Sequence, residues 1–114
     1  MNNDRVIKDG KVAVLVSPGY GGSWSYYVSG EYKNTFLFCP PIVNHLLECG
    51  EIEASEAEAL MEEYTGLDED DLPYVGGASQ LHIVWVEVGT KFRISEYDGA
   101  ECLVRFNPDS YTTA

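Results

Sequence analysis

The sequence predicts an α+β fold, with an antiparallel sheet of about four strands and two helices packed on one face. Three observations lead to this prediction: an apolar, β-branched run near the start, two segments with apolar residues at helical spacing, and short apolar runs separated by turn dipeptides after residue 80. The 114 residues are enough for one hydrophobic core and too few for two. We therefore expect a single domain, 1–114, with strands at 11–17, 80–88, 91–97 and 100–106 and helices near 41–49 and 55–65.

The run at 11–17 is expected to lie inside the sheet, because both of its faces are apolar. One face carries Val12, Val14 and Val16, and the other carries Ala13 and Leu15. The polar residues 1–10 predict an N-terminal arm or edge strand that closes with the turn dipeptide Asp9-Gly10. A short extended piece is expected at 35–38. It should stop at Cys39-Pro40-Pro41, because the residue before a proline is disfavoured in the helical region.

Both predicted helices have recognisable ends. Pro41 suits the first turn of a helix, and Gly50 supplies the left-handed residue that ends it. A capping box of Ser55 and Glu58 predicts the start of the second helix, and Gly66 predicts its end. The core side of this second helix is expected to consist of Ala57, Leu60, Met61 and Tyr64.

The segment after residue 80 is expected to form an antiparallel meander. Its first strand is apolar on both faces, which predicts a central position in the sheet. The second strand alternates, with Phe92 and Ile94 inward and Lys91 and Arg93 outward. Residues 107–114 are expected to form a polar tail.

The composition limits the partners that the protein can have. The formal net charge of −12 argues against direct binding to nucleic acid or to an anionic membrane. The sequence has neither an apolar run long enough to span a membrane nor the start of a signal peptide, so we expect a cytoplasmic protein. The three cysteines lack metal spacing and are expected to be reduced core thiols, with no metal and no cofactor.

A glycine-rich loop follows the first strand and is the first candidate site. Glycines leave backbone N–H groups uncovered, and such groups hold anions, while the aromatic residues offer stacking surfaces. The predicted ligand is a nucleotide-like molecule, with its base stacked on Trp24 or a tyrosine. The alternative is a tight loop whose aromatic residues cap the core. The candidate ligand-binding residues are Ser17, Gly19, Tyr20, Gly21, Gly22, Ser23, Trp24, Ser25 and Tyr26.

The same loop lacks the marks of known catalytic motifs. It has no lysine for a phosphate-binding P-loop, Trp24 stands where a dinucleotide fingerprint needs glycine, and Ser23 has no nucleophile-elbow context. We therefore expect a binding protein and not an enzyme. A small nucleotide-acting enzyme that uses Glu96, Asp98 or His82 is the least favoured alternative.

An acidic block is the second candidate site. No Lys or Arg occurs between Lys33 and Lys91, whereas twelve acidic residues do. Such a surface can imitate the phosphates of nucleic acid and occupy the basic groove of a partner, although it is more often a solvated helix face. The candidate partner-binding residues are Glu62, Glu63, Asp68, Asp70 and Asp71.

Two stretches, VAVLVSPGYGGSWS from Val12 and GTKFRISEYDG from Gly89, carry a resemblance. Together they resemble a set of small uncharacterised proteins encoded by bacteriophages. The resemblance implies expression in a bacterial cytoplasm, where such proteins block host defence. We therefore predict a counter-defence protein that sequesters a nucleotide-type signalling molecule without catalysis. The alternative is an acidic nucleic-acid mimic that binds a host defence protein; the oligomeric state is open, with a homo-oligomer among the options.

Overall fold

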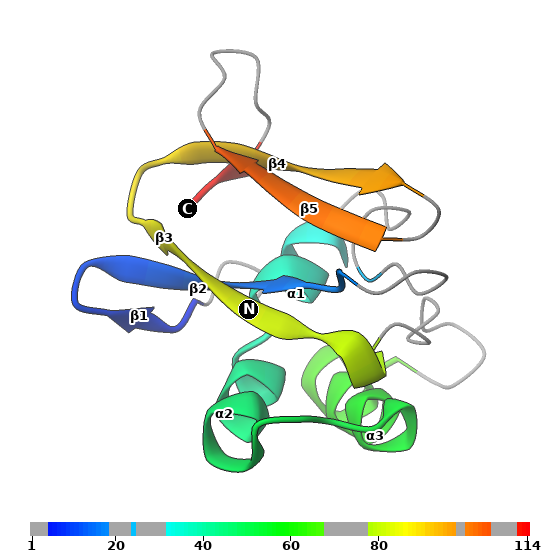
Figure 1. Ribbon diagram of the computed structural model, residues 1–114. Coiled ribbons are helices and arrows are strands. Elements are labelled where there is room, and N and C mark those ends of the chain that lie inside the picture. The colour runs from blue at the N-terminus through cyan, green and yellow to red at the C-terminus, as the bar shows by residue number, and fades with distance from the viewer. Residues whose placement is uncertain (1–4, 19–23, 25–31, 68–77, 98–99, 106–111) are drawn as a thin grey trace.

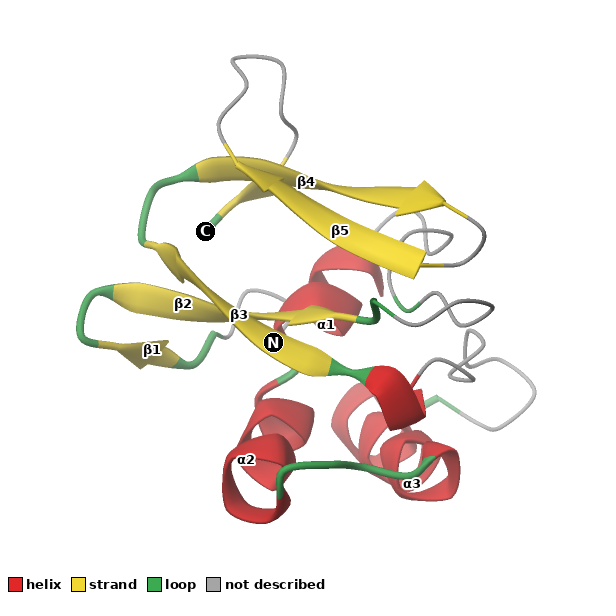
Figure 2. Ribbon diagram, in the orientation of Figure 1, coloured by secondary structure: helices red, strands yellow, loops and turns green. Residues whose placement is uncertain are grey.

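The computed structural model describes residues 5–18, 24, 32–67, 78–97, 100–105 and 112–114. The fold is α+β, as predicted (Figures 1 and 2). The strands are β1 (Ile7–Lys8), β2 (Lys11–Val16), β3 (His82–Glu87), β4 (Lys91–Tyr97), β5 (Ala100–Arg105) and β6 (Thr112–Thr113). The helices are α1 (Tyr32–Phe38), α2 (Pro40–Cys49) and α3 (Ala54–Thr65), with a short 3-10 turn at Ala78–Gln80.

The strands form two antiparallel sheets, in the orders β1-β2-β3 and β5-β4-β6, instead of the single sheet that was expected. The predicted turn between β3 and β4 does not close a hairpin but carries the chain from one sheet to the other. Val88 donates its backbone N–H to Gly10 of the first sheet, and Gly89 donates to Ala114 beside the second. β3 therefore lies at an edge of the first described sheet and not at its centre.

The sheet β1-β2-β3 forms the middle layer of the molecule. In Figures 1 and 2, α2 and α3 lie on one side of it and the sheet β5-β4-β6 on the other. β2 has the central position that its apolar faces predicted. Its residues Ala13 and Leu15 pack into the core on the helix side, whereas Val12, Val14 and Val16 pack into a second core with Phe92 and Ile94 of β4.

α1 replaces the extended piece that was expected at 35–38. All of its residues from Thr35 to Phe38 are buried, because the helix contributes to both cores. Phe36 packs into the helix-side core, whereas Phe38 meets Phe92 edge to face at a ring-centroid distance of 6.2 Å. The helix still ends before the prolines, with Cys39 in a non-helical conformation.

The other two helices form as predicted, apart from the start of α3. Gly50 and Gly66 end α2 and α3 in the left-handed conformation, with φ of 83° and 75°. The capping residue of α3 is Glu53, not Ser55, and its backbone N–H donates to Oε1 of Glu56 at 3.1 Å. Ile52 comes one position before the capping residue and Ala57 comes four positions after it. Both are buried in the helix-side core, and an apolar pair at this spacing fixes where a helix begins.

The segment predicted as a polar tail contributes to the second sheet. β6 pairs with β4, and Ala114 is buried in the core beside Phe92. Ala114 donates its backbone N–H to Thr90 and accepts a hydrogen bond from Gly89. Arg5 reaches the same end, with one guanidinium N–H donating to the carbonyl oxygen of Thr113 at 3.1 Å.

Candidate functional site

One carboxylate from β5 joins the two ends of the glycine loop. Glu101 is 3% exposed, and its Oε1 accepts a hydrogen bond from the backbone N–H of Ser17 at 3.0 Å. Its Oε2 accepts one from the backbone N–H of Trp24 at 2.9 Å. The backbone N–H of Glu101 also donates to the carbonyl oxygen of Ser17 at 2.8 Å. Glu101 therefore connects β5 to the end of β2 and fixes where the loop leaves and rejoins the core.

Trp24 belongs to the core and not to an exposed stacking surface. Its side chain is 1% exposed and lies against Phe36, with ring centroids 4.8 Å apart. Its indole N–H donates to the carbonyl oxygen of Phe36 at 2.6 Å. Because the protein covers this ring, a ligand base has no face of Trp24 to stack on in this structure. Trp24 therefore caps the core, which was the alternative to a ligand-stacking role for the aromatic residues of the loop.

The structure describes only two of the nine predicted ligand-binding residues. These two, Ser17 and Trp24, are buried, and both of their backbone N–H groups bind Glu101. The backbone N–H groups at the two described ends of the loop were expected to bind the anionic group of a ligand. They bind the carboxylate of Glu101 instead. The other candidates lie outside the described residues: Gly19, Tyr20, Gly21, Gly22, Ser23, Ser25 and Tyr26.

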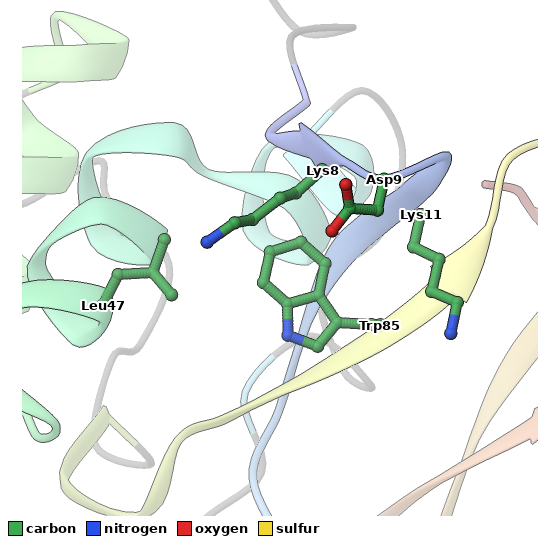
Figure 3. A pocket seen from close by; sticks show the side chains of 5 residues that line it. All are labelled: Lys8, Asp9, Lys11, Leu47 and Trp85. Carbon is green, nitrogen blue, oxygen red and sulfur yellow. The ribbon is translucent and has the colours of Figure 1, made fainter.

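A pocket of about 470 Å³ lies where the N-terminal hairpin meets α2 and β3, and it is lined by Lys8, Asp9, Lys11, Leu47 and Trp85 (Figure 3). Lys8 and Lys11 lie directly opposite each other across the β1–β2 hairpin. The turn between them consists of Asp9 and Gly10, both with positive φ, as an Asp-Gly hairpin requires. Figure 3 shows the indole of Trp85 between Lys8, whose side chain extends toward Leu47, and Lys11. The pocket volume is in the range of small-molecule sites.

The helical side of the molecule is strongly acidic. We use the name acidic layer for α2, α3 and the residues that join and follow them, 40–67. This layer contains no Lys or Arg and carries Glu48, Glu51, Glu53, Glu56, Glu58, Glu62 and Glu63. All seven basic residues of the chain lie on other elements, namely Arg5, Lys8, Lys11, Lys33, Lys91, Arg93 and Arg105. No Lys or Arg within the acidic layer therefore balances the negative charge of its glutamates.

Three of these glutamates stand at helix ends where negative charge is unfavourable. Glu48 lies in the last turn of α2, and Glu62 and Glu63 lie in the last turn of α3. Neither helix has a basic residue there, although the exposed carbonyl groups at a helix C-terminus favour cations. Of the three, Glu63 lines a pocket of about 290 Å³ together with Pro41, Leu60 and Tyr64. Of the predicted partner-binding residues, Asp68, Asp70 and Asp71 lie outside the described residues.

The two histidines lie on different elements of the described part of the chain. His45 on α2 lies 3.5 Å from Glu56, while His82 is exposed on β3. Within the described residues, no group of three or more His, Cys, Asp or Glu side chains is placed to hold a metal ion. Nor is any helix of this part long and apolar enough to cross a membrane.

The expectation of core thiols holds for only one cysteine. All three cysteines are free, but only Cys39 is buried; Cys49 and Cys102 are exposed. Cys49 is the last residue of α2, and Cys102 points outward on β5 because its neighbour Glu101 points inward. Burial raises the pKa of the Cys39 thiol from 9.0 to about 11.

Comparison of the chain with protein-family models, curated proteins and solved structures finds no match. The chemistry of the described residues is therefore the basis of the function proposed below.

Sequence reasoning missed Glu101 and the pocket around Trp85. Glu101 stands two residues before Leu103 on the same strand, so strand alternation places an acid on the core side of β5. The alternation was visible in the sequence, but the loop residues that donate hydrogen bonds to Glu101 were not. Lys8 and Lys11 flank a predicted two-residue turn, so their opposition was also visible. The position of Trp85 beside these two lysines could not be predicted, because it depends on the pairing of β2 with β3.

Proposed function

We propose that the protein is a non-catalytic interaction protein whose acidic layer binds a positively charged surface of a partner protein. A surface that normally holds nucleic acid fits best, because its Lys and Arg side chains are spaced to meet repeated negative charges. The phage resemblance would make this partner a host defence protein in the bacterial cytoplasm. Sequestration of a nucleotide-type signal by the glycine loop remains a prediction for residues outside the described part.

The observation that carries this proposal is the position of Glu48, Glu62 and Glu63. An exposed charge that only keeps a protein soluble serves equally well anywhere on the surface. At a helix C-terminus it instead opposes the helix dipole, typically by ~0.3–1 kcal/mol for each charge. Three such placements, with no basic residue in either last turn, favour a role in binding over a role in stability.

The neighbouring pocket gives the acidic layer an apolar contact as well. Leu60 and Tyr64 are half-buried and line it together with Pro41 and Glu63. Apolar contacts between partly buried side chains supply affinity, whereas the surrounding charges steer the partner and set its orientation. A basic partner with one apolar side chain among its cationic groups matches this surface.

Capture of nucleic-acid-binding proteins from a bacterial lysate tests the proposal. We expect the immobilised protein to retain proteins that an excess of duplex DNA then elutes. The double substitution Glu62→Lys/Glu63→Lys should abolish this retention, because it reverses the charge beside the pocket. The matched control is Glu87→Lys, an exposed reversal on β3 outside the acidic layer. Retention of the same DNA-eluted proteins by the double variant would contradict the proposal.

A further inference from the structure

We propose that the pocket between Lys8, Lys11 and Trp85 binds a small planar molecule with a single anionic group, of the nucleoside monophosphate class. This inference is independent of the acidic layer. It rests on three features of the pocket: two opposed cations, a half-buried indole and a carboxylate at the rim.

The two lysines are placed as a pair. Lys8 and Lys11 are cross-strand neighbours at the end of the β1–β2 hairpin, so their side chains share one face of the sheet. Like charges in this position repel each other, and Glu87 of β3 lies directly opposite Lys11 only, not Lys8. The protein has only seven basic residues, and it places two of them here. Figure 3 shows their ammonium groups on either side of the Trp85 indole, so a ligand stacked on the indole would have a cation on each side to which one phosphate or carboxylate can bind.

Trp85 supplies the surface for the planar part of the ligand. It lies opposite Ala13 in the sheet and packs against the helix-side core. The indole is half-buried, and Leu47 of α2, which lines the same pocket, is 48% exposed. Aromatic rings of this kind stack on nucleobases irrespective of base identity.

Asp9 sets the charge and polarity of the ligand. Its carboxylate lines the pocket and points toward the indole in Figure 3. It would accept a hydrogen bond from an amino group on the heterocycle, and it would repel every phosphate, so the repulsion grows with each phosphate added. The pocket therefore fits a molecule with one phosphate and an amino-bearing base better than a nucleoside triphosphate.

Nuclear magnetic resonance of the two indole N–H groups tests this site directly. Adenosine monophosphate, adenosine and inorganic phosphate are added separately to the full-length protein. We expect the monophosphate to shift the Trp85 signal and to leave the Trp24 signal in place, because the Trp24 indole N–H is buried and bonded to Phe36. Adenosine and phosphate alone should each bind roughly tenfold more weakly, since each keeps only part of the contacts.

Substitutions identify the side chains that hold the anion. Lys8→Gln and Lys11→Gln should each weaken binding of the monophosphate by roughly tenfold, as expected for loss of a charged hydrogen bond. Lys91→Gln, at an exposed lysine of β4, is the matched control and should bind like the wild type. Two results would overturn the inference: a Trp85 signal that stays in place at millimolar monophosphate, or an affinity that neither pocket lysine changes.

Discussion

The carboxylate of Glu101 accepts a hydrogen bond from the backbone N–H of Trp24 at 2.9 Å, although 77 positions separate the two residues in the sequence. Ser17 binds the other carboxylate oxygen, so one buried side chain holds both ends of the glycine loop. We infer that this carboxylate is required for the fold around the loop.

Glu101→Gln tests that requirement with an isosteric change. The amide keeps one acceptor oxygen but turns an NH₂ group toward the second backbone N–H, which loses its partner. We expect the free energy of unfolding to fall by about 1–3 kcal/mol, the usual cost of an unsatisfied buried donor. Chemical denaturation measures this change. Glu87→Gln, at an exposed glutamate of β3, should leave stability unchanged; equal stability of the two variants would show that the Glu101 contacts contribute nothing.

Trp24 should behave as a core residue. Trp24→Ala is expected to destabilise the protein by about 3–5 kcal/mol, because it removes a large side chain from a packed interior. Trp24→Phe should cost less, since the ring remains and only the hydrogen bond to Phe36 and part of the volume are lost. Thermal and chemical unfolding of both variants give the comparison. A Trp24→Ala protein as stable as the wild type would contradict the core position.

The three cysteines should differ in reactivity. At pH 8 a thiol-specific disulfide reagent should modify Cys49 and Cys102 quickly, because both are exposed. Cys39 should react only after unfolding, since it is buried and its pKa is raised to about 11. Fast modification of three thiols in the folded protein would be inconsistent with this structure.

The raised pKa of Cys39 also predicts a pH dependence of stability. The folded protein keeps the Cys39 proton to a higher pH than the unfolded chain does, so this stabilisation is complete below pH 9 and is lost as the pH rises toward about 11. The loss amounts to roughly 2–3 kcal/mol over that interval. Denaturation of the wild type and of Cys39→Ala at pH 8 and pH 11 measures it. The variant should show a smaller fall, and equal falls would contradict the assignment to Cys39.

The sequence predicted those elements whose signals are local. The run at 11–17 showed its two apolar faces, and Gly50 and Gly66 marked the helix ends because only a left-handed residue fits there. The expectation of an extended piece at 35–38 was wrong, because a proline restricts only the residue before it. Cys39 is non-helical as expected, whereas the four residues before it are helical and buried in two cores. The turn at 88–90 has the same local signal in a hairpin and in a crossing between sheets, so the split of the sheet was not visible.

The candidate sites were predicted less completely than the fold. The acidic character of α3 follows from composition, but Glu58 and Glu62 are half-buried, whereas Glu56 and Glu63 are exposed. Trp24 was ambiguous, because an aromatic residue beside glycines serves a core or a ligand equally well. The choice depended on Phe36 and Glu101, whose contacts with Trp24 are long-range and have no local signal.

The opposed lysines predict an unusual response of stability to charge removal. Lys8→Gln relieves a like-charge pair across the hairpin, so it should not lower the free energy of unfolding and can raise it by roughly 0.2–1 kcal/mol. Lys11→Gln also removes a positive charge that lies opposite Glu87, so its two effects should offset each other. Thermal unfolding at low salt shows the effect best, because salt screens exposed charges. A clear loss of stability in Lys8→Gln would mean that this lysine is kept for the fold.

The most direct test of the acidic layer measures stability and partner binding on the same protein, Glu62→Lys/Glu63→Lys. This variant replaces unfavourable charges at the C-terminal end of α3 by favourable ones, so its melting temperature should equal or exceed that of the wild type. Its binding to the DNA-eluted partner should be lost. A lower melting temperature, or binding that persists, would contradict the claim that these glutamates are kept for a partner at the expense of helix stability.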